Sequence, residues 1–229
     1  MALFSEIISL IKNLPRKGDG DSDDNSYTDR MLAFIINTQR AVLIKQGKDK
    51  GRYLSQNYVQ SLGKVEIQKA SKHECCITDN DIGDCIYRIK EPLPTPVDTN
   101  GLNLITFVGT VDGLTNWQRT SFNKVQFDSY AKYTADRIKW YQLNNYIYIV
   151  AKGVKNLKYI NIQGVFESPE KANDYRDCGC IGEDCFKGFD FDYPMNSSDI
   201  PVIIRLIAAS ELAMSGMLPK DEKNDSRDI

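Results

Sequence analysis

Strand-type sequence fills the middle of this chain from Lys64 to Phe166, between segments whose apolar residues have helical spacing. The middle is rich in β-branched and aromatic residues, which fit a pleated, half-buried surface. Alternation with a period of two is clearest at Ile160, Ile162 and Gly164. A long β-rich stretch beside helical segments predicts an α+β fold. The predicted strands are KVEIQKA, CIYRIK, NLITFVG, DRIKWYQ, YIYIVAK and LKYINIQGVF.

Two local signals indicate how these strands are connected. The run Leu143-Asn144-Asn145-Tyr146 predicts a tight antiparallel hairpin, because Asn tolerates the positive φ that a primed two-residue turn demands. Pro92, Pro94 and Pro96 predict an extended connector, because proline fixes its own φ and restricts the residue before it. We expect this connector to carry the chain from one sheet layer to another.

The second helix of the chain carries a polar interruption. Ser26 or Thr28 can cap its N-terminus, and Gly47 is expected to mark its end. The polar stretch 37–40 separates its apolar residues, which are Leu32, Ile35, Ile36, Val42 and Leu43. We therefore expect the helix to pack over most of its length and to expose the polar stretch 37–40 to solvent or to a neighbouring molecule.

Each end of the chain carries a further helical pattern. The first thirteen residues place their apolar side chains on one broad helical face. The last helix, from about Asp199 to Ser215, has only Arg205 and Glu211 as charged residues in its apolar stretch. A helix that is apolar on nearly every side belongs in a core or between subunits.

These patterns divide the chain into three parts. Residues 1–27 form an arm that contains an amphipathic helix and an acidic linker, residues 28–218 form the α+β core, and residues 219–229 form a polar tail. The expected fold thus has N-terminal helices, a β-rich middle with antiparallel hairpins, and an apolar C-terminal helix.

Composition argues against two classes of partner. The net charge of −2 does not suit a globally basic nucleic-acid binder, because neutralising phosphates requires a clear excess of Lys and Arg. No stretch reaches the roughly 18 consecutive apolar residues that a membrane-spanning helix needs. The N-terminal segment also has Glu6 among its apolar residues and no positive region before them, unlike a secretory signal. We expect an intracellular protein without a membrane partner.

The cysteines and the single histidine are the residues that most suggest chemistry. His73 lies two residues from Cys75, but nucleophilic catalysis needs the imidazole within hydrogen-bond reach of the sulfur and a third group that orients it. We therefore predict no enzymatic activity and no cofactor. Cys178, Cys180 and Cys185 could place three thiolates around a zinc ion, with His73 or another cysteine as the fourth ligand. Bound zinc, a disulfide and free thiols are the three alternatives for these residues.

Charge is distributed unevenly in the second half of the chain. Basic residues dominate between 132 and 158, at Lys132, Arg137, Lys139, Lys152, Lys155 and Lys158, and acidic residues dominate between 167 and 192. Two solvated faces are the simpler interpretation. The functional alternative is a head-to-tail contact in which the basic edge of one subunit meets the acidic loop of its neighbour. The residues proposed for this contact are Lys152, Lys155, Lys158, Glu183, Asp184 and Asp190.

The order of elements and several local strings point to one family of viral proteins. The helix TDRMLAFIINTQRAVLIKQGKDKGRYLS is followed by QNYVQSLGKVEIQKASKHECC, DCIYRIKEPLPTPV, NLITFVGTVD, LNNYIYIV and LKYINIQGVFESPEKANDY. Over residues 28–219 this succession resembles the virion ring proteins of crAss-like tailed bacteriophages.

The resemblance implies a virion structural protein that forms a ring in the head-to-tail connector, between the capsid portal and the tail. It implies twelve copies, contacts with the portal protein and with other neck or tail rings, and a channel through which genomic DNA passes without sequence-specific binding. The protein would be made in the cytoplasm of the bacterial host. We expect residues 219–229 to dock on the portal or on the adjoining ring. The alternatives are an auxiliary capsid or tail-barrel component and a zinc-stabilised binding module.

Overall fold

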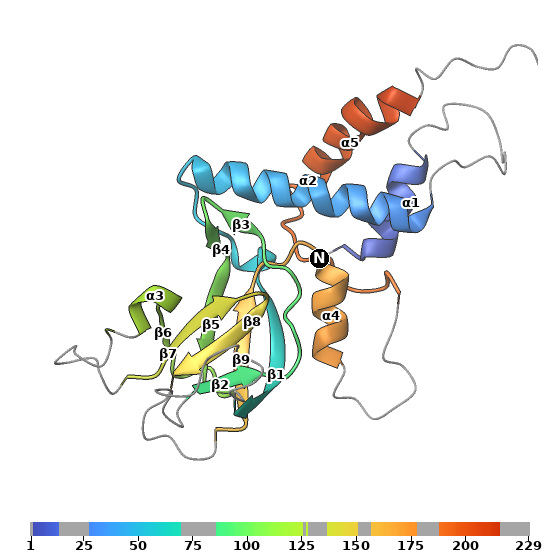
Figure 1. Cartoon of the computed structure of the whole chain (residues 1–229). Helices are drawn as coiled ribbons and strands as arrows, with labels where there is room; N and C mark the ends of the chain where they lie inside the picture. The colour runs from blue at the N-terminus through green and yellow to red at the C-terminus, as the bar shows by residue number, and fades with distance from the viewer. Residues whose placement is uncertain are drawn as a thin grey trace, which may run out of the picture.

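The computed structural model shows a layer of helices at one end of a curled β-sheet (Figure 1). The predicted α+β class is confirmed. The residues that the structure describes are 2–13, 28–69, 86–125, 127, 137–150, 157–177 and 188–215.

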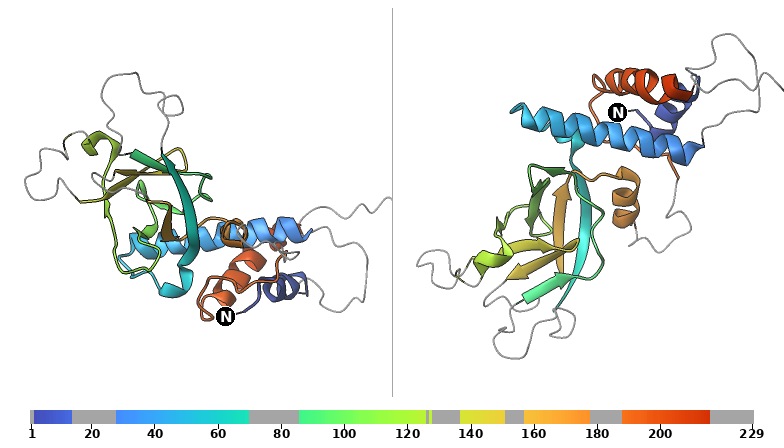
Figure 2. Two further views of the ribbon diagram at one scale, coloured as in Figure 1. Left: turned by 90° about the horizontal axis from the view of Figure 1, so that it is seen from below. Right: turned by 45° about the horizontal axis from the view of Figure 1, so that its top comes forward.

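Three helices form the helical layer: α1 (Phe4–Asn13), α2 (Asp29–Asp49) and α5 (Ile200–Ser215). The longest of them, α2, lies across the end of the sheet, and α1 and α5 lie together on one side of it (Figure 2). A further helix, α4 (Pro169–Asp177), packs beside the sheet. Two short elements, the 3₁₀-helix η1 (Gln56–Tyr58) and α3 (Phe122–Val125), were not predicted from the sequence.

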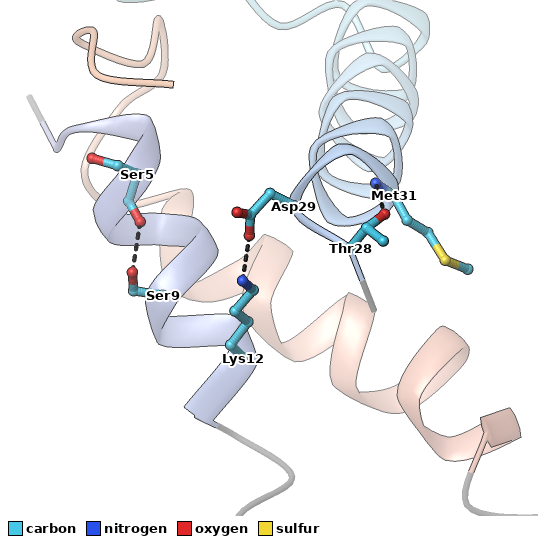
Figure 3. Close-up of polar contacts among 6 residues, drawn as sticks. All are labelled: Ser5, Ser9, Lys12, Thr28, Asp29 and Met31. Carbon is cyan, nitrogen blue, oxygen red and sulfur yellow. Dashed lines mark hydrogen bonds and ion pairs between the residues drawn. The ribbon is translucent and has the colours of Figure 1, made fainter. Parts of the chain in front are cut away.

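The start of α2 is fixed by side chains on both helices of the N-terminal region (Figure 3). The Thr28 hydroxyl accepts a hydrogen bond from the Met31 N–H at 3.3 Å, which confirms Thr28 as the N-cap. Lys12, at the end of α1, forms an ion pair with Asp29 in the first turn of α2. The last turn of α1 and the first turn of α2 therefore lie side by side.

The end of α2 differs from the prediction. The helix runs past Gly47 to Asp49, and Gly51 adopts the positive φ of 73° that ends it. The Gly51 N–H donates to the Lys48 carbonyl and the Arg52 N–H to the Gly47 carbonyl, both at 2.9 Å. This is the Schellman pattern, in which the left-handed glycine follows the last helical residues. The prediction was wrong because two glycines lie close together in the sequence and only the second takes that conformation.

Seven strands form one curled sheet in the order β5-β9-β1-β2-β8-β7-β6. Their bounds are β1 (Gln60–Lys69), β2 (Ile86–Ile89), β5 (Ile105–Gly109), β6 (Gln118–Arg119), β7 (Lys139–Leu143), β8 (Tyr146–Val150) and β9 (Tyr159–Gly164). β6 pairs with β7 in parallel, and the other pairs of described strands are antiparallel. A separate small sheet pairs β3 (Asp98–Thr99) with β4 (Leu102–Asn103).

Both predicted connections are found. Leu143 pairs with Tyr146 across the β7–β8 hairpin, and Asn144 and Asn145 have φ values of 49° and 62°. The proline connector leaves the seven-stranded sheet after β2 and leads into the small β3–β4 sheet. From there the chain enters the seven-stranded sheet again at its edge strand β5.

The curl of the sheet brings its two edges together. At the end of β5, Gly109 bridges to Asn116, and the Trp117 N–H donates to the Val108 carbonyl at 2.8 Å. A Cβ atom on Gly109 would lie 1.9 Å from the Thr115 carbonyl oxygen, so this close approach requires glycine. The segment before β6 is thereby joined to β5 at the opposite edge.

The buried apolar side chains form two clusters, one for each layer. The sheet cluster lies inside the curl, and it includes Leu62, Ile89, Trp140, Ile149 and Ile162. The helical cluster lies among α1, α2 and α5, and it includes Phe4, Ile7, Leu32, Ile36 and Ile203.

Among the described side chains, the buried residues of α5 lie on one face of the helix. Ile203 and Ile207 are 1% and 0% exposed and belong to the helical cluster, whereas Val202 and Leu206 are each 43% exposed. The expectation that this helix lies in a core is therefore met by one face of its described side chains, and the adjacent face carries the exposed apolar groups of Val202 and Leu206.

Candidate assembly surfaces

A buried arginine joins the helical layer to the sheet. Arg40 of α2 is fully buried, and its guanidinium donates hydrogen bonds to three backbone carbonyls. Nη1 donates to Phe166 O at 2.9 Å, Nε to Pro194 O at 3.1 Å, and Nη2 to Tyr58 O at 3.3 Å. Phe166 follows β9, Pro194 precedes α5, and Tyr58 precedes β1. One side chain therefore holds together the three places where the chain passes between the layers.

Two tyrosines and an amide complete this Arg40 junction. The guanidinium carbon lies 5.9 Å from the centroid of the Tyr58 ring and 5.7 Å from that of the Tyr193 ring. The Tyr193 hydroxyl donates to Asn37 Oδ1 at 3.0 Å, and Asn37 Nδ2 donates to the Glu170 carboxylate of α4 at 2.9 Å. Burial raises the pKa of Tyr193, so its phenol stays a neutral donor.

The prediction that the polar stretch 37–40 of α2 faces solvent or a neighbour is wrong for Asn37 and Arg40, whereas Thr38 is exposed as predicted. Asn37 and Arg40 are 6% and 0% exposed, whereas the apolar Phe34 is 71% exposed. These two polar side chains point inward because buried backbone carbonyls, where the chain passes between the helical layer and the sheet, need hydrogen-bond donors that water cannot supply. One sequence signal could have indicated this: Arg40 lies four residues from both Ile36 and Ile44, on the same helical face.

The N-terminal helix is held to the rest of the helical layer by an aromatic cage. The Phe4 ring stacks on Tyr193 with centroids 4.6 Å apart, and it lies 5.4 Å from Phe189 and 5.5 Å from Phe191. The Phe4 N–H also donates to the Phe191 carbonyl at 3.0 Å, and the Ser5 N–H to the Phe189 carbonyl at 2.9 Å. Because α1 is only ten residues long, it depends on these contacts for its stability.

The outer face of α2 carries three exposed large apolar side chains beside the exposed Thr38 and Lys45. Met31, Phe34 and Val42 are 47%, 71% and 42% exposed and recur along one side of the helix. A cavity of about 470 Å³ lies beside this face, between α2 and α4. Its charged lining groups have both signs, since it includes Arg30 and Lys171 as well as Glu167 and Glu170.

A groove with a different character lies between the end of α2, the residues that follow it, and the start of α5. This α2–α5 groove has a volume of about 490 Å³. Apolar side chains line one part of it, namely Leu43, Leu54, Val202 and Leu206. Its rim carries the fully exposed Tyr53 and three cations, Lys48, Lys50 and Arg52. The groove therefore combines exposed apolar surface with positive charge.

The charged residues proposed for subunit contact are described in part. Lys158 is exposed, and its carbonyl accepts from the Ile67 N–H near the end of β1, which runs away from the helical layer (Figure 1). Asp190 is exposed beside α1, where its carboxylate accepts from the Ser5 hydroxyl at 3.3 Å. These two charges are thus at opposite ends of the molecule. Lys152, Lys155, Glu183 and Asp184 lie outside the described residues.

One member of the basic stretch does not contribute to a charged edge. Lys139 is only 5% exposed, because it lies on β7 with its neighbours Trp140 and Tyr141, which are also buried. The basic stretch between 132 and 158 is therefore not uniformly on the surface.

The zinc candidates Cys178, Cys180 and Cys185 and the pair His73 and Cys75 also lie outside the described residues. Within the described ranges, no group of three or more His, Cys, Asp or Glu residues is arranged to hold a metal ion.

Among the described residues, no helix combines the length and the apolar character needed to cross a membrane.

Comparison with known proteins identifies the family. A search of curated proteins finds no similar sequence. A family model described as phage tail ring protein 2, from crAss-like phages, matches residues 5–228. The match includes both layers of the fold, the Arg40 junction and the α2–α5 groove. Because it spans nearly the whole chain, the protein belongs to the phage tail ring protein 2 family.

Proposed function

We propose that this protein forms a ring in the head-to-tail connector of the virion and joins the capsid portal to the tail. The observation that carries the proposal is the family match over residues 5–228. Two exposed apolar regions support it, the outer face of α2 and the α2–α5 groove, because exposed apolar patches of this kind are typical of interaction sites. The ring has twelve copies, matches the symmetry of the portal and surrounds a channel for DNA.

The role is mechanical. A ring subunit must hold its two neighbours and the components above and below it, and it must keep these surfaces in fixed relative positions. The Arg40 junction serves this requirement, because it fixes the helical layer on the sheet through hydrogen bonds to three separate segments. Genomic DNA passes through the channel without sequence-specific contacts.

Mass measurement and virion reconstruction test this assignment. We expect the purified protein, alone or with the portal protein, to form a closed ring of twelve copies. A reconstruction of the virion should place that ring between the portal and the tail. A ring located only within the tail barrel, or single copies on the capsid, would contradict the connector role and support the alternative of an auxiliary component.

Charge reversal at Lys152, Lys155 and Lys158 should weaken the ring. In the proposed contact these cations meet Glu183, Asp184 and Asp190 of the neighbouring copy, so glutamates there would repel the acidic groups. We expect the triple Glu variant to assemble at least about tenfold more weakly than the wild type at low salt, with a smaller difference at high salt. The measurement is the mass distribution of the protein as a function of concentration. The triple Arg variant, which keeps the charges, is the control.

If the triple Glu variant has unchanged stoichiometry at low salt, these charges do not pair and the ring is held by other contacts.

Substitution of His73 by Ala should leave assembly and infectivity nearly intact. A mechanical role needs no nucleophile, and His73 is the only histidine in the chain. The measurement is the titre of phage that carry the variant, with the amount of assembled protein as the control. A severe loss of infectivity in normally assembled particles would instead indicate catalysis at this position.

A further inference from the structure

We propose that the α2–α5 groove of one copy binds residues 216–229 of a neighbouring copy, so that adjacent subunits are linked head to tail. The inference rests on the proposed ring, and it names the segment and the surface that make one contact between subunits. It differs from the sequence-based expectation that the tail docks on the portal or on the adjoining ring.

The groove requires an occupant with apolar and acidic groups. Val202 and Leu206 are each 43% exposed on its apolar side, and Tyr53 is 100% exposed at its rim. Among the described residues, none of the rim cations Lys48, Lys50 and Arg52 forms an ion pair with a carboxylate. These groups leave apolar surface and positive charge available to a ligand.

The carboxylate already in the groove is occupied. Asp199 lines the groove, and its carboxylate accepts hydrogen bonds from the Tyr58 hydroxyl and from Asn196 Nδ2, the latter at 3.0 Å. Because Asp199 is engaged by these two neutral donors, it does not pair with the rim cations, and an incoming ligand meets a net positive charge.

The segment after α5 carries the matching groups in a suitable order. Its sequence is GMLPKDEKNDSRDI, in which Met217 and Leu218 precede the adjacent acids Asp221 and Glu222, and its four acidic residues outnumber its three basic ones. The two apolar side chains suit the apolar side of the groove, and the two carboxylates suit the cations of its rim. The acidic linker of the chain is a poorer candidate, because Arg16 and Lys17 separate its apolar Leu14 from its first aspartate, Asp19.

Chain geometry excludes the same copy as the donor of Met217 and Leu218. Val202 and Leu206 lie in the groove, and at about 1.5 Å per residue the helix carries the chain about 20 Å from Val202 and about 14 Å from Leu206 to Ser215. The three residues from Ser215 to Leu218 can return at most about 10 Å. The apolar pair of the same copy therefore cannot reach the middle of its own groove.

The direction of α5 favours a neighbour. The last turn of the helix points away from the sheet (Figure 1). A neighbouring subunit placed on that side of the helical layer can receive the segment that follows. Groove and segment are different surfaces of one chain, so each copy gives its segment to one neighbour and receives that of the other. Such a heterologous contact can close into a ring.

Paired charge reversals test the proposal in the full chain. The groove variant carries Lys50→Glu and Arg52→Glu, and the tail variant carries Asp221→Lys and Glu222→Lys. We expect each variant alone to assemble at least about tenfold more weakly than the wild type at low salt, because like charges then face each other. An equal mixture should recover assembly close to that of the wild type. In a ring where the two variants alternate, every tail meets a groove of opposite charge.

A control variant, measured in the same assembly assay, tests whether the effect is specific to the groove. A variant with Lys90→Glu and Lys124→Glu changes the charge equally on exposed residues outside the groove and outside α2, and it should assemble like the wild type. Thermal unfolding of each variant checks that the fold is intact. Normal assembly of either reversed variant alone, or a mixture no better than its parts, overturns the proposal while the ring of the wild type stands. A wild-type chain that stays monomeric with and without portal overturns both.

Crosslinking gives an independent result. Wild-type protein labelled with ¹⁵N is mixed with unlabelled protein, allowed to assemble, and treated with a carbodiimide that joins carboxylates to amines in contact. From an equal mixture we expect about half of the peptides that link Lys48 or Lys50 to Asp221 or Glu222 to contain one labelled and one unlabelled partner, because neighbouring copies come at random from the two pools. If every linked peptide has both partners labelled or both unlabelled, the link forms within one copy and binding by a neighbour is contradicted. The absence of any link between these residues would contradict it as well.

Discussion

Replacing Arg40 by Ala is expected to lower the free energy of unfolding by about 3–5 kcal/mol. The guanidinium is fully buried, and it is the donor to the carbonyls of Phe166, Pro194 and Tyr58. Truncation leaves these acceptors without their donor at the boundary between the two layers, and it also removes a large side chain from a packed site. The measurement is equilibrium unfolding in urea, followed by circular dichroism.

Further substitutions separate hydrogen bonding from packing. Arg40→Met keeps most of the side-chain volume but supplies no donor, so we expect it to lose most of the same free energy. Arg40→Lys keeps the charge, but its single ammonium cannot reach three carbonyls on different segments, and it should recover only part of the loss. Gln39→Ala, at the neighbouring and less buried position, is the control and should change stability by less than about 0.5 kcal/mol. A stable Arg40→Met variant would show that the hydrogen bonds are dispensable.

Replacing Phe4 by Ala should have an effect of similar size, about 3–5 kcal/mol, but with a local pattern. Phe4 is 0% exposed, and its ring contacts Phe189, Phe191 and Tyr193. Without the ring, α1 loses its main attachment and is too short to persist alone. We expect amide hydrogen exchange to accelerate most in α1 and in the segment 189–193, and least in the strands of the sheet.

Leu10 provides the matched control on the same helix. It is 56% exposed, so Leu10→Ala should change the free energy of unfolding by less than about 0.5 kcal/mol. If Phe4→Ala accelerates exchange equally in α1 and in the sheet, then α1 unfolds together with the whole domain. The aromatic cage would in that case support the global fold rather than the attachment of one helix.

Features that depend on neighbouring residues were predictable from the sequence. Thr28 caps α2 because its hydroxyl reaches an N–H three residues away, and Asn144 and Asn145 make a turn because both tolerate positive φ. The predicted strands and the order of elements, which together indicated the family, likewise follow from patterns within single segments. The choice between Gly47 and Gly51 as the end of α2 was not determined in this way, because both glycines satisfy the local rule.

The direction in which the polar part of α2 points was decided only by the tertiary structure. The acceptors of Arg40 lie 18, 126 and 154 residues away in the sequence, so no local pattern contains them. The α2–α5 groove depends in the same way on contact between two helices that are far apart along the chain. The sequence by itself determined the longer helices and six of the strands, because the preference for each is local, whereas the short elements η1, α3, β3, β4 and β6 were not predicted. Which of their faces are buried and which remain open to partners depends on the packing of distant segments against one another.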